Sequence, residues 1–368
     1  MLELRKKLAN YQEIFYMLFL LPMTGMTSMG LNSEDRIYLY VFAVATLFLL
    51  LKMAVTDFTW LEIVIMGVFT LLLGANFLRN GEKTLILTAM GIFGAKNVNL
   101  DKVMKYALWE KAVLTVGTLT LAATGVIENV AFELPKNLEW YTIYSYGYET
   151  PNMAFANIFV ILLLAIIVYG DRLRWYAYVG GTAIILGAYR LFMCRTGVVV
   201  WGILCAMVGF YYLMRKLHFE RIGMKIFSLI PIILSWMTLW IPHLIKKDPN
   251  IGIKLDVFMT GRLRLIGLVY NDVWTWSFKL GHVPMQPFDT MYFHLLYNYG
   301  WILFVLCLVA YAGEIWYCST KGKNYIVIAL GAMAIYGYME LLPLSVLWNL
   351  PLLYLTLILF QGKKLRNE

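Results

Sequence analysis

Long apolar segments recur along almost the whole chain, separated by short stretches that hold most of its charged residues. A helix needs about 20 apolar residues to cross the hydrocarbon core of a bilayer, within a range of about 17–25. The candidate segments are 13–31, 37–54, 59–78, 84–95, 112–127, 153–169, 176–193, 197–214, 224–241, 289–311, 324–342 and 345–361. The sequence therefore predicts an all-α polytopic membrane protein with about twelve transmembrane helices, in one membrane domain over 1–368.

The composition indicates that lipid is the main solvent of the chain. Of its 368 residues, 61% are hydrophobic and only 14% are charged, against about 25% charged in an ordinary soluble domain. The net charge of +9 arises from basic residues that gather in the short loops between apolar runs. That distribution is how membrane topology is encoded, and it does not indicate nucleic-acid binding.

The basic residues also orient the predicted spans. Arg5, Lys6 and Lys7 precede the first apolar run, which ends without a small-residue cleavage site and is interpreted as an uncleaved first helix. With twelve spans and an internal N-terminus, most of the 31 Lys and Arg residues lie on the inner side. Both termini are then cytoplasmic. The segment 84–95 is short enough to re-enter rather than span, and the orientation of every later span depends on it.

Two predicted outer loops are longer than turns, at about 128–152 and at 242–288. Within the second loop, apolar residues recur at the spacing of one helix face, which predicts an amphipathic helix over about 255–273. Arg262 emerges from that apolar stripe. A guanidinium held there requires a carboxylate or a phosphate partner. Pairing with a local acid or a lipid headgroup is the alternative to a role in catalysis.

Polar residues at two other outer boundaries are further candidates. Arg190 and Arg195 lie at the junction of the seventh and eighth spans, where arginine also serves as a headgroup anchor. The tenth span opens with Asp289, and His294 and Asn298 pair on a different helix face from it. Asp289 lies at the first turn and suits either a helix cap or a base.

Several motifs that would indicate other chemistry are absent from the sequence. There is no GxxxxGK[ST] loop, no HExxH motif and no DxD-like acidic pair. The four cysteines show no CxxC spacing, and Cys205 and Cys307 fall inside apolar runs, so neither a disulfide framework nor a metal site is indicated. A cytoplasmic nucleotide-driven enzyme is thereby disfavoured.

Short motifs follow one another in a particular order along nearly the whole chain. YGYETPN (146–152) leads into a span, and RTG (195–197) opens another. TGR (260–262) in the late loop is followed by DTMY (289–292) and then by NYGWI (298–302). In this order and position they resemble the Wzy-type polysaccharide repeat-unit polymerases, relatives of the O-antigen ligases. The run GAKN at 94–97 is similar to capsule and exopolysaccharide members from Gram-positive bacteria.

The resemblance implies a GT-C-type glycosyltransferase acting at the outer face of the bacterial cytoplasmic membrane. Its donor is a glycan on undecaprenyl diphosphate, and its acceptor is one lipid-linked repeat unit. An acceptor hydroxyl attacks the anomeric carbon and lipid diphosphate leaves, with no metal ion or other cofactor. The implied partners are these lipid-linked oligosaccharides, the bilayer, and flippase and chain-length regulator proteins.

The resemblance also implies roles for individual residues. Arg195 and Arg262 match outer-face arginines that grip the diphosphate, with Arg190 and Arg264 as neighbours in that role. Asp289 occupies the place of a ligase histidine and is the candidate base, with His294 or His282 as alternatives. The residues expected to contact sugar or acceptor are Tyr292, Tyr146, Tyr148 and Asn152.

Three other readings use the same sequence features. A twelve-span transporter normally has ionisable groups at mid-membrane, whereas the predicted spans hold few charges away from their ends. A flippase for the same lipid-linked oligosaccharide shares the substrate and compartment. An O-antigen ligase shares the fold and chemistry, and the absence of its histidine at Asp289 argues against it.

Overall fold

The computed structural model describes residues 8, 10–136, 139–248, 250, 256, 262, 263, 266 and 288–360. The chain forms two compact units. Unit 1 comprises Met1–Asp57 and Gly94–Met207, and unit 2 comprises Phe58–Phe93 and Val208–Glu368. The described residues are mostly helical, which agrees with the helical membrane protein that the sequence predicts.

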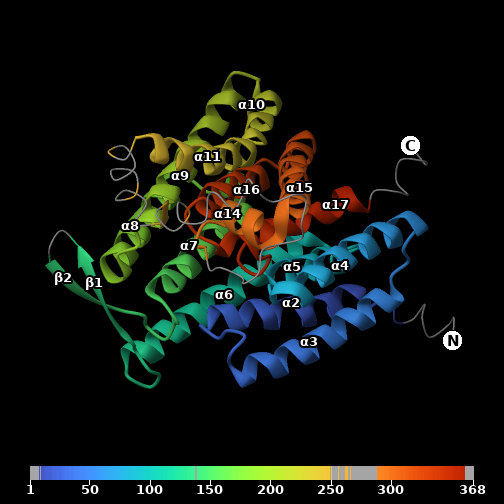
Figure 1. Ribbon diagram of the computed structural model, residues 1–368, viewed down its shortest axis with the longest axis horizontal. Coiled ribbons are helices and arrows are strands. Elements are labelled where there is room, and N and C mark those ends of the chain that lie inside the picture. The colour runs from blue at the N-terminus through green and yellow to red at the C-terminus, as the bar shows by residue number, and fades with distance from the viewer. Residues whose placement is uncertain are drawn as a thin grey trace. The chain divides into compact units, whose positions relative to one another are not determined.

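Unit 1 is a set of helices with one small hairpin. Its helices are α2 (Gln12–Ser28), α3 (Arg36–Val55), α6 (Leu100–Ala123), α7 (Pro151–Tyr169), η1 (Gly170–Arg172), α8 (Trp175–Phe192) and the first part of α9 (Arg195–Lys216). Helix α2 packs against α3 and α6, and α7 packs against α6 and α8. Figure 1 shows α2 and α3 side by side. Asn99 caps α6 through the Lys102 amide, and Pro151 begins α7, where its missing N–H has no cost.

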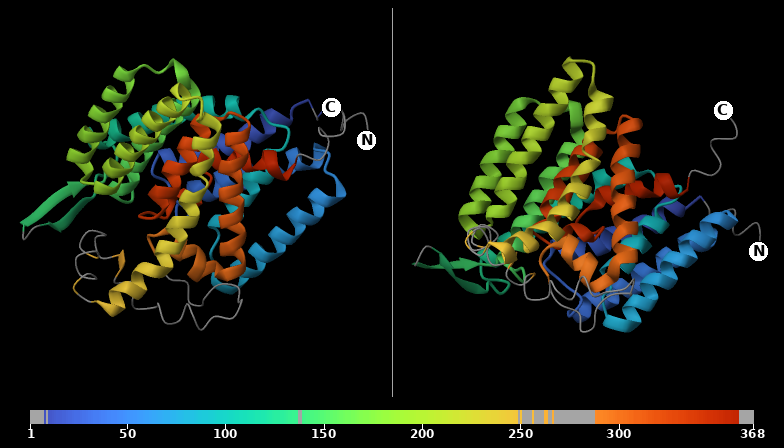
Figure 2. Two further views of the ribbon diagram at one scale, coloured as in Figure 1. Left: turned by 90° about the horizontal axis from the view of Figure 1, so that it is seen from above. Right: turned by 45° about the horizontal axis from the view of Figure 1, so that its top comes forward.

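The hairpin is a feature that the all-α prediction did not include. Strand β1 (Ala131–Lys136) pairs antiparallel with β2 (Glu139–Tyr144), so that Ala131 lies opposite Tyr144. The second strand reads Glu-Trp-Tyr-Thr-Ile-Tyr, and its aromatic and β-branched residues favour extended backbone. The hairpin falls inside the predicted outer loop 128–152 and projects beyond the helices of its unit (Figure 2).

Unit 2 combines long helices with short, irregular ones. Its elements are α4 (Trp60–Asn80), α5 (Thr84–Gly94), α10 (Glu220–Ile226), α11 (Leu229–Lys247), α14 (Met291–His294), the π-helical segment η2 (Leu295–Tyr299), α15 (Gly300–Thr320), α16 (Asn324–Gly337), η3 (Leu342–Leu344), η4 (Leu350–Leu355) and α17 (Thr356–Leu359). Helix α15 packs against α16, and α11 contacts both. A capping box between Thr59 and Glu62 begins α4, and Gly81 ends it at φ 79°.

Six helices in the described part of the chain are long and apolar enough to cross a bilayer. They are Arg36–Val55, Trp60–Asn80, Pro151–Arg172, Arg195–Lys216, Glu220–Ile241 and Met291–Thr320. Three further apolar helices are shorter: Thr84–Gly94, Asn324–Gly337 and Leu350–Leu359. The 11 residues of α5 extend over about 16 Å, roughly half of the hydrocarbon core. The chain is therefore embedded in a membrane.

Some helices differ from the predicted spans in where they begin and end. Helix α6 begins at Leu100, well before the predicted start at 112, and α15 continues to Thr320, beyond 311. These extensions place Lys111 and Glu314 within helices, and both side chains are fully buried. Glu314 thus adds a charge inside the helix Met291–Thr320, whereas α6, which carries Lys111, is not among the six helices apolar enough to span. The segment predicted at 345–361 becomes helical only at Leu350.

Little of the predicted amphipathic helix belongs to the described residues. Asp256, Arg262, Leu263 and Ile266 are described, and all four are helical. Leu263 and Ile266 are buried, as expected for its apolar face. The rest of 255–273, and most of the predicted loop 242–288, lies outside the described residues. The start of that loop is helical, because α11 continues to Lys247.

Candidate functional site

Arg262 lies between two carboxylates of unit 2. Its Nε atom is 3.1 Å from Oδ2 of Asp289, and its Nη2 atom is 2.8 Å from Oε1 of Glu340. The side chains of Arg262 and Glu340 are about one-tenth exposed, whereas that of Asp289 is 58% exposed. One guanidinium thus joins a buried carboxylate to an accessible one.

Packing between two short segments holds the carboxylates in place. Asp289 comes just before α14, and Glu340 comes just after α16. The Tyr292 hydroxyl donates to the Ala334 carbonyl over 3.0 Å. A Cβ atom at Gly337 would approach Cε of Met291 to 2.7 Å, so the glycine allows α14 and α16 to lie close together.

The helical residues beside Arg262 are anchored in the same region. Leu263 and Ile266 belong to a buried apolar cluster that includes Phe288 and Met291. This cluster holds the backbone that carries Arg262 next to the start of α14. The sequence singled out Arg262 and Asp289 separately, and the structure brings them together.

The ionisation of the Glu340 carboxyl group depends on burial and on the charges of Arg262 and Asp289. Glu340 lies beyond the end of α16, and burial raises the pKa of its carboxyl group to about 7, with Arg262 lowering and Asp289 raising it. Near neutral pH, the Glu340 carboxyl is therefore only partly ionised. Asp289 is exposed and can meet a substrate hydroxyl. The arrangement can accept a proton and, through Arg262, stabilise an anion.

The structure also excludes one alternative for Asp289. Thr290 occupies the N-cap position of α14, and no side chain caps that helix. The carboxylate of Asp289 instead contacts Arg262. Asp289 is thus an ion-pair partner and not a helix cap.

His294 lies in a separate buried cluster of unit 2. Its Nε2 atom is 3.3 Å from Oε2 of Glu82, and its Nδ1 atom is 3.1 Å from the Asn298 side-chain amide. The predicted pairing of His294 with Asn298 is therefore confirmed. The Tyr299 hydroxyl donates to Oε1 of Glu82 over 3.1 Å and accepts from the Leu85 amide. His294 is only 1% exposed, so a substrate hydroxyl has little access to it in this conformation.

Glu82, in the turn between α4 and α5, is the charged centre of that cluster. Burial raises its pKa, but contact with His294 and hydrogen bonding from Thr84 lower it more, to about 2 overall. The hydrogen bonds of this cluster connect the turn to the π-helical segment Leu295–Tyr299. Such segments occur frequently at functional sites. The π-helical segment also changes which residues lie on one face. The residues that follow it no longer share a face with Asp289, as they would in a regular α-helix.

The arginine motif of unit 1 has an exposed and a buried part. Arg190 lies in the last turn of α8 and Arg195 begins α9, and both side chains are exposed. Thr196 and Gly197 are buried, and the Phe155 ring occupies the space that a Cβ at Gly197 would need. The motif therefore combines close helix packing with an accessible guanidinium.

The predicted sugar-binding residues lie in different environments. The Tyr148 hydroxyl donates to the Ser28 carbonyl over 2.6 Å, and both Tyr148 and Tyr292 are buried. Tyr146 has a positive φ of 50°, and its ring packs edge-on against Phe192. Asn152 is half-buried near the start of α7. Contact between sugar and any of these residues stays a prediction. Arg264 and His282 lie outside the described residues.

A buried lysine in unit 1 was missed by the sequence reasoning. Nζ of Lys111 lies 3.2 Å from Oγ1 of Thr27, 3.3 Å from Oγ of Ser28 and 3.5 Å from Oδ1 of Asn157. It links α6 to α2 and α7. Glu340 and Glu82 were missed as well. A charged residue beside or within an apolar run is the signal that could have identified all three.

Comparisons of this chain with family models, with curated proteins and with solved structures found no match.

Proposed function

We propose that this protein is a polysaccharide polymerase, joining oligosaccharide repeat units carried on undecaprenyl diphosphate. The observation that carries the proposal is Arg262 held between Asp289 and Glu340. Arg262 lies within the long late loop and Asp289 follows that loop directly before the helix Met291–Thr320, an order similar to that of the family that the motifs resemble. The proposal includes twelve spans, cytoplasmic termini and an active site on the outer face.

The proposed reaction uses one accessible carboxylate and one guanidinium. A hydroxyl of the acceptor repeat unit attacks the anomeric carbon of the donor glycan. The new glycosidic C–O bond forms, and the bond from the anomeric carbon to the diphosphate oxygen breaks. The hydroxyl proton passes to the Asp289 carboxylate, and the electron pair leaves with the lipid diphosphate.

Arg262 would stabilise the charge that develops on the departing diphosphate. Its bond to the buried Glu340 keeps the planar guanidinium in position. The exposed Asp289 can release it when a diphosphate approaches, because an exposed ion pair contributes little free energy. Loss of that pair also leaves the Asp289 carboxylate available to the acceptor hydroxyl.

The test is polymerisation by the purified full-length chain in detergent. Synthetic undecaprenyl-diphosphate repeat units are supplied without ATP, and the products are separated on a gel and identified by mass spectrometry. We expect a ladder spaced by one repeat unit, lost in Arg262→Ala and retained in Arg172→Ala, which alters an exposed arginine elsewhere. An unchanged ladder in Arg262→Ala would contradict the diphosphate role.

A second candidate is a flippase or transporter of the same lipid-linked oligosaccharide. The observation that favours it is Lys111, fully buried among polar oxygens of α2 and α7. Lys111 lies at the edge of the predicted span 112–127, and ionisable groups within membrane spans commonly mark substrate or proton pathways. Transfer of a labelled lipid-linked oligosaccharide across liposomes containing the protein, with loss in Lys111→Met, would favour this candidate. Absence of transfer above protein-free liposomes would remove it.

A further inference from the structure

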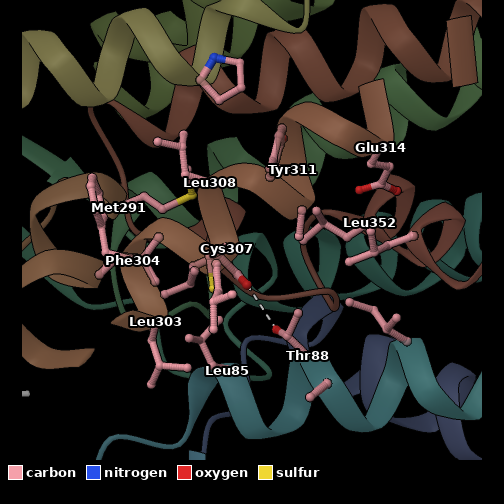
Figure 3. A pocket seen from close by; sticks show the side chains of 18 of the residues that line it. Leu85, Thr88, Met291, Leu303, Phe304, Cys307, Leu308, Tyr311, Glu314 and Leu352 are labelled. Atoms are coloured by element: carbon pink, nitrogen blue, oxygen red, sulfur yellow. Dashed lines mark hydrogen bonds between the residues drawn. The ribbon is translucent and has the colours of Figure 1, made fainter. Parts of the chain in front are cut away.

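Unit 2 contains a cavity of about 130 Å³ between its helices. Its wall is almost entirely apolar and is built from α4, α5, α11, α14, α15 and the C-terminal segments. Figure 3 shows Leu85, Phe304, Cys307 and Leu352 among the side chains that line it. An apolar cavity of about 150 Å³ stays dry and accepts a molecule the size of benzene. The cavity therefore suits a hydrocarbon body of about six carbons.

Glu314 is the charged residue in this wall. It projects from α15, is 0% exposed, and lies at the opposite end of the view from Met291 in Figure 3. Neither carboxyl oxygen has a hydrogen-bond partner among the described residues. The Leu355 backbone amide lies near the carboxyl group, but the contact does not meet the distance and angle of a hydrogen bond. A buried polar group without a partner costs about 1–3 kcal/mol.

The hydroxyl groups in the same wall are already used within the protein. Thr88 donates to the Leu344 carbonyl over 3.0 Å, and Ser235 donates to the Pro231 carbonyl over 2.8 Å. Tyr311 and Tyr292 likewise donate to backbone carbonyls of α16. A buried water molecule needs two to four polar partners, and these lining residues offer it little beyond Glu314. The lining therefore suits an apolar molecule with one polar end better than it suits water.

The polar end is best matched by a neutral hydroxyl. A hydroxyl can donate to one carboxyl oxygen and can also accept from a carboxylic acid. An ammonium group would have to lose its own hydration beside a carboxylate, and such buried ion pairs often fail to recover that cost. A purely apolar molecule would fill the cavity but leave Glu314 without a partner.

We propose that this cavity is a binding site for an apolar alcohol, a hydrocarbon chain or ring that carries one hydroxyl, with the hydroxyl bound to Glu314. The proposal does not depend on the proposed polymerisation, although the cavity shares Met291 and Tyr292 with the packing beside Arg262. The alcohol would come from the surrounding membrane. One hydrogen bond, at the end of the apolar cavity, would recognise its hydroxyl group.

The test compares two molecules of equal size on the purified full-length protein. Benzyl alcohol and ethylbenzene have the same number of non-hydrogen atoms, and only the first carries a hydroxyl. Thermal unfolding in detergent is followed at increasing concentrations of each. A bound ligand at ten times its dissociation constant should raise the midpoint by about 2 °C. We expect benzyl alcohol to raise it in the wild type at lower concentration than ethylbenzene does.

Two variants assign the effect to the cavity. Ala89→Phe fills it from α5 and should abolish the response to both molecules. Glu314→Met keeps the side-chain length without the carboxyl group and should reverse the preference toward ethylbenzene. Glu128→Met, which alters an exposed glutamate, should respond as the wild type does.

Two outcomes would overturn the proposal. Equal stabilisation of the wild type by both molecules would show an apolar cavity without recognition of a hydroxyl. Equal responses of the wild type and Ala89→Phe would show that binding occurs elsewhere. If Glu314→Met does not fold, the wild type and Ala89→Phe still decide between these results.

Discussion

Nε of Arg262 lies 3.1 Å from Oδ2 of Asp289, although the two residues are 27 positions apart in the sequence. The same guanidinium contacts the buried Glu340 from a third segment. Arg262 therefore serves two carboxylates in very different environments, one exposed and one buried. Removing the guanidinium should affect the two contacts unequally, since burial determines what an ion pair contributes.

Arg262→Met should destabilise the protein by about 1–3 kcal/mol, because the buried Glu340 carboxyl loses its hydrogen-bond donor and must take up a proton. Arg262→Met combined with Glu340→Met should recover most of that loss, since no buried polar group is then left without a partner. Asp289→Asn alone should change stability by less than about 1 kcal/mol. Unfolding midpoints in detergent measure all three. A double variant less stable than Arg262→Met would contradict this account.

Glu82 should make the protein sensitive to acid. Its pKa in the folded protein is about 2, below the ordinary value of 4.5, through contact with His294 and Thr84 against the effect of burial. The unfolded chain then binds the proton more readily. Stability from this group is therefore fully present above about pH 4.5 and is lost as pH falls toward 2.

The corresponding experiment measures thermal unfolding at several pH values between 6 and 3. The midpoint of the wild type should fall across this range, and that of Glu82→Gln should fall less. Glu128→Gln, at an exposed position, should follow the wild type. Identical pH profiles for Glu82→Gln and the wild type would exclude a stabilising carboxylate at this position.

Two substitutions of Lys111 should have different effects. The three oxygens that it contacts belong to groups that keep other hydrogen bonds: Thr27 and Ser28 donate to the Thr24 carbonyl, and Asn157 donates to the Thr27 carbonyl. Lys111→Met preserves the volume and should change stability by less than about 1 kcal/mol. Lys111→Ala leaves a cavity and should cost about 2–4 kcal/mol. Equal losses in the two variants would show that the charge itself stabilises the fold.

Two glycines of α9 provide a matched comparison. The Phe155 ring occupies the space for a Cβ at Gly197, whereas no atom lies within 4 Å of a Cβ at Gly202. Gly197→Ala should destabilise the protein by about 1–3 kcal/mol, and Gly202→Ala should stabilise it by about 0.5–1 kcal/mol. Thermal unfolding of both variants is the measurement. A stabilising Gly197→Ala would show that α7 and α9 do not pack so closely.

The apolar runs predicted the positions of the helices well, because burial in lipid requires little more than length and hydrophobicity. The apolar runs did not predict where a helix begins or ends when charged residues lie within that helix. Helix α6 starts before its apolar run, since Lys102, Lys105 and Lys111 lower the hydropathy without interrupting the helix. The π-helical segment depends on Tyr299 and Asn298 contacting a distant turn, and no local pattern encodes such contacts.

The candidate site was predictable in part for a related reason. Arg262 and Asp289 stood out because each is charged at the edge of an apolar pattern. Glu340 has the same property, but its relation to Arg262 joins segments 78 positions apart and arises only when α14 packs on α16. The cavity beside Glu314 depends on how side chains of many elements fill space, which the sequence pattern does not specify.

The measurement that tests the central claim most directly is polymerisation by Asp289→Asn. The amide keeps the size of the carboxylate but accepts a proton poorly, so the rate of ladder formation should fall by about 100-fold or more, with stability close to that of the wild type. Glu128→Asn should leave the rate unchanged. A wild-type rate of polymerisation in a folded Asp289→Asn variant would contradict the assignment of Asp289 as the base.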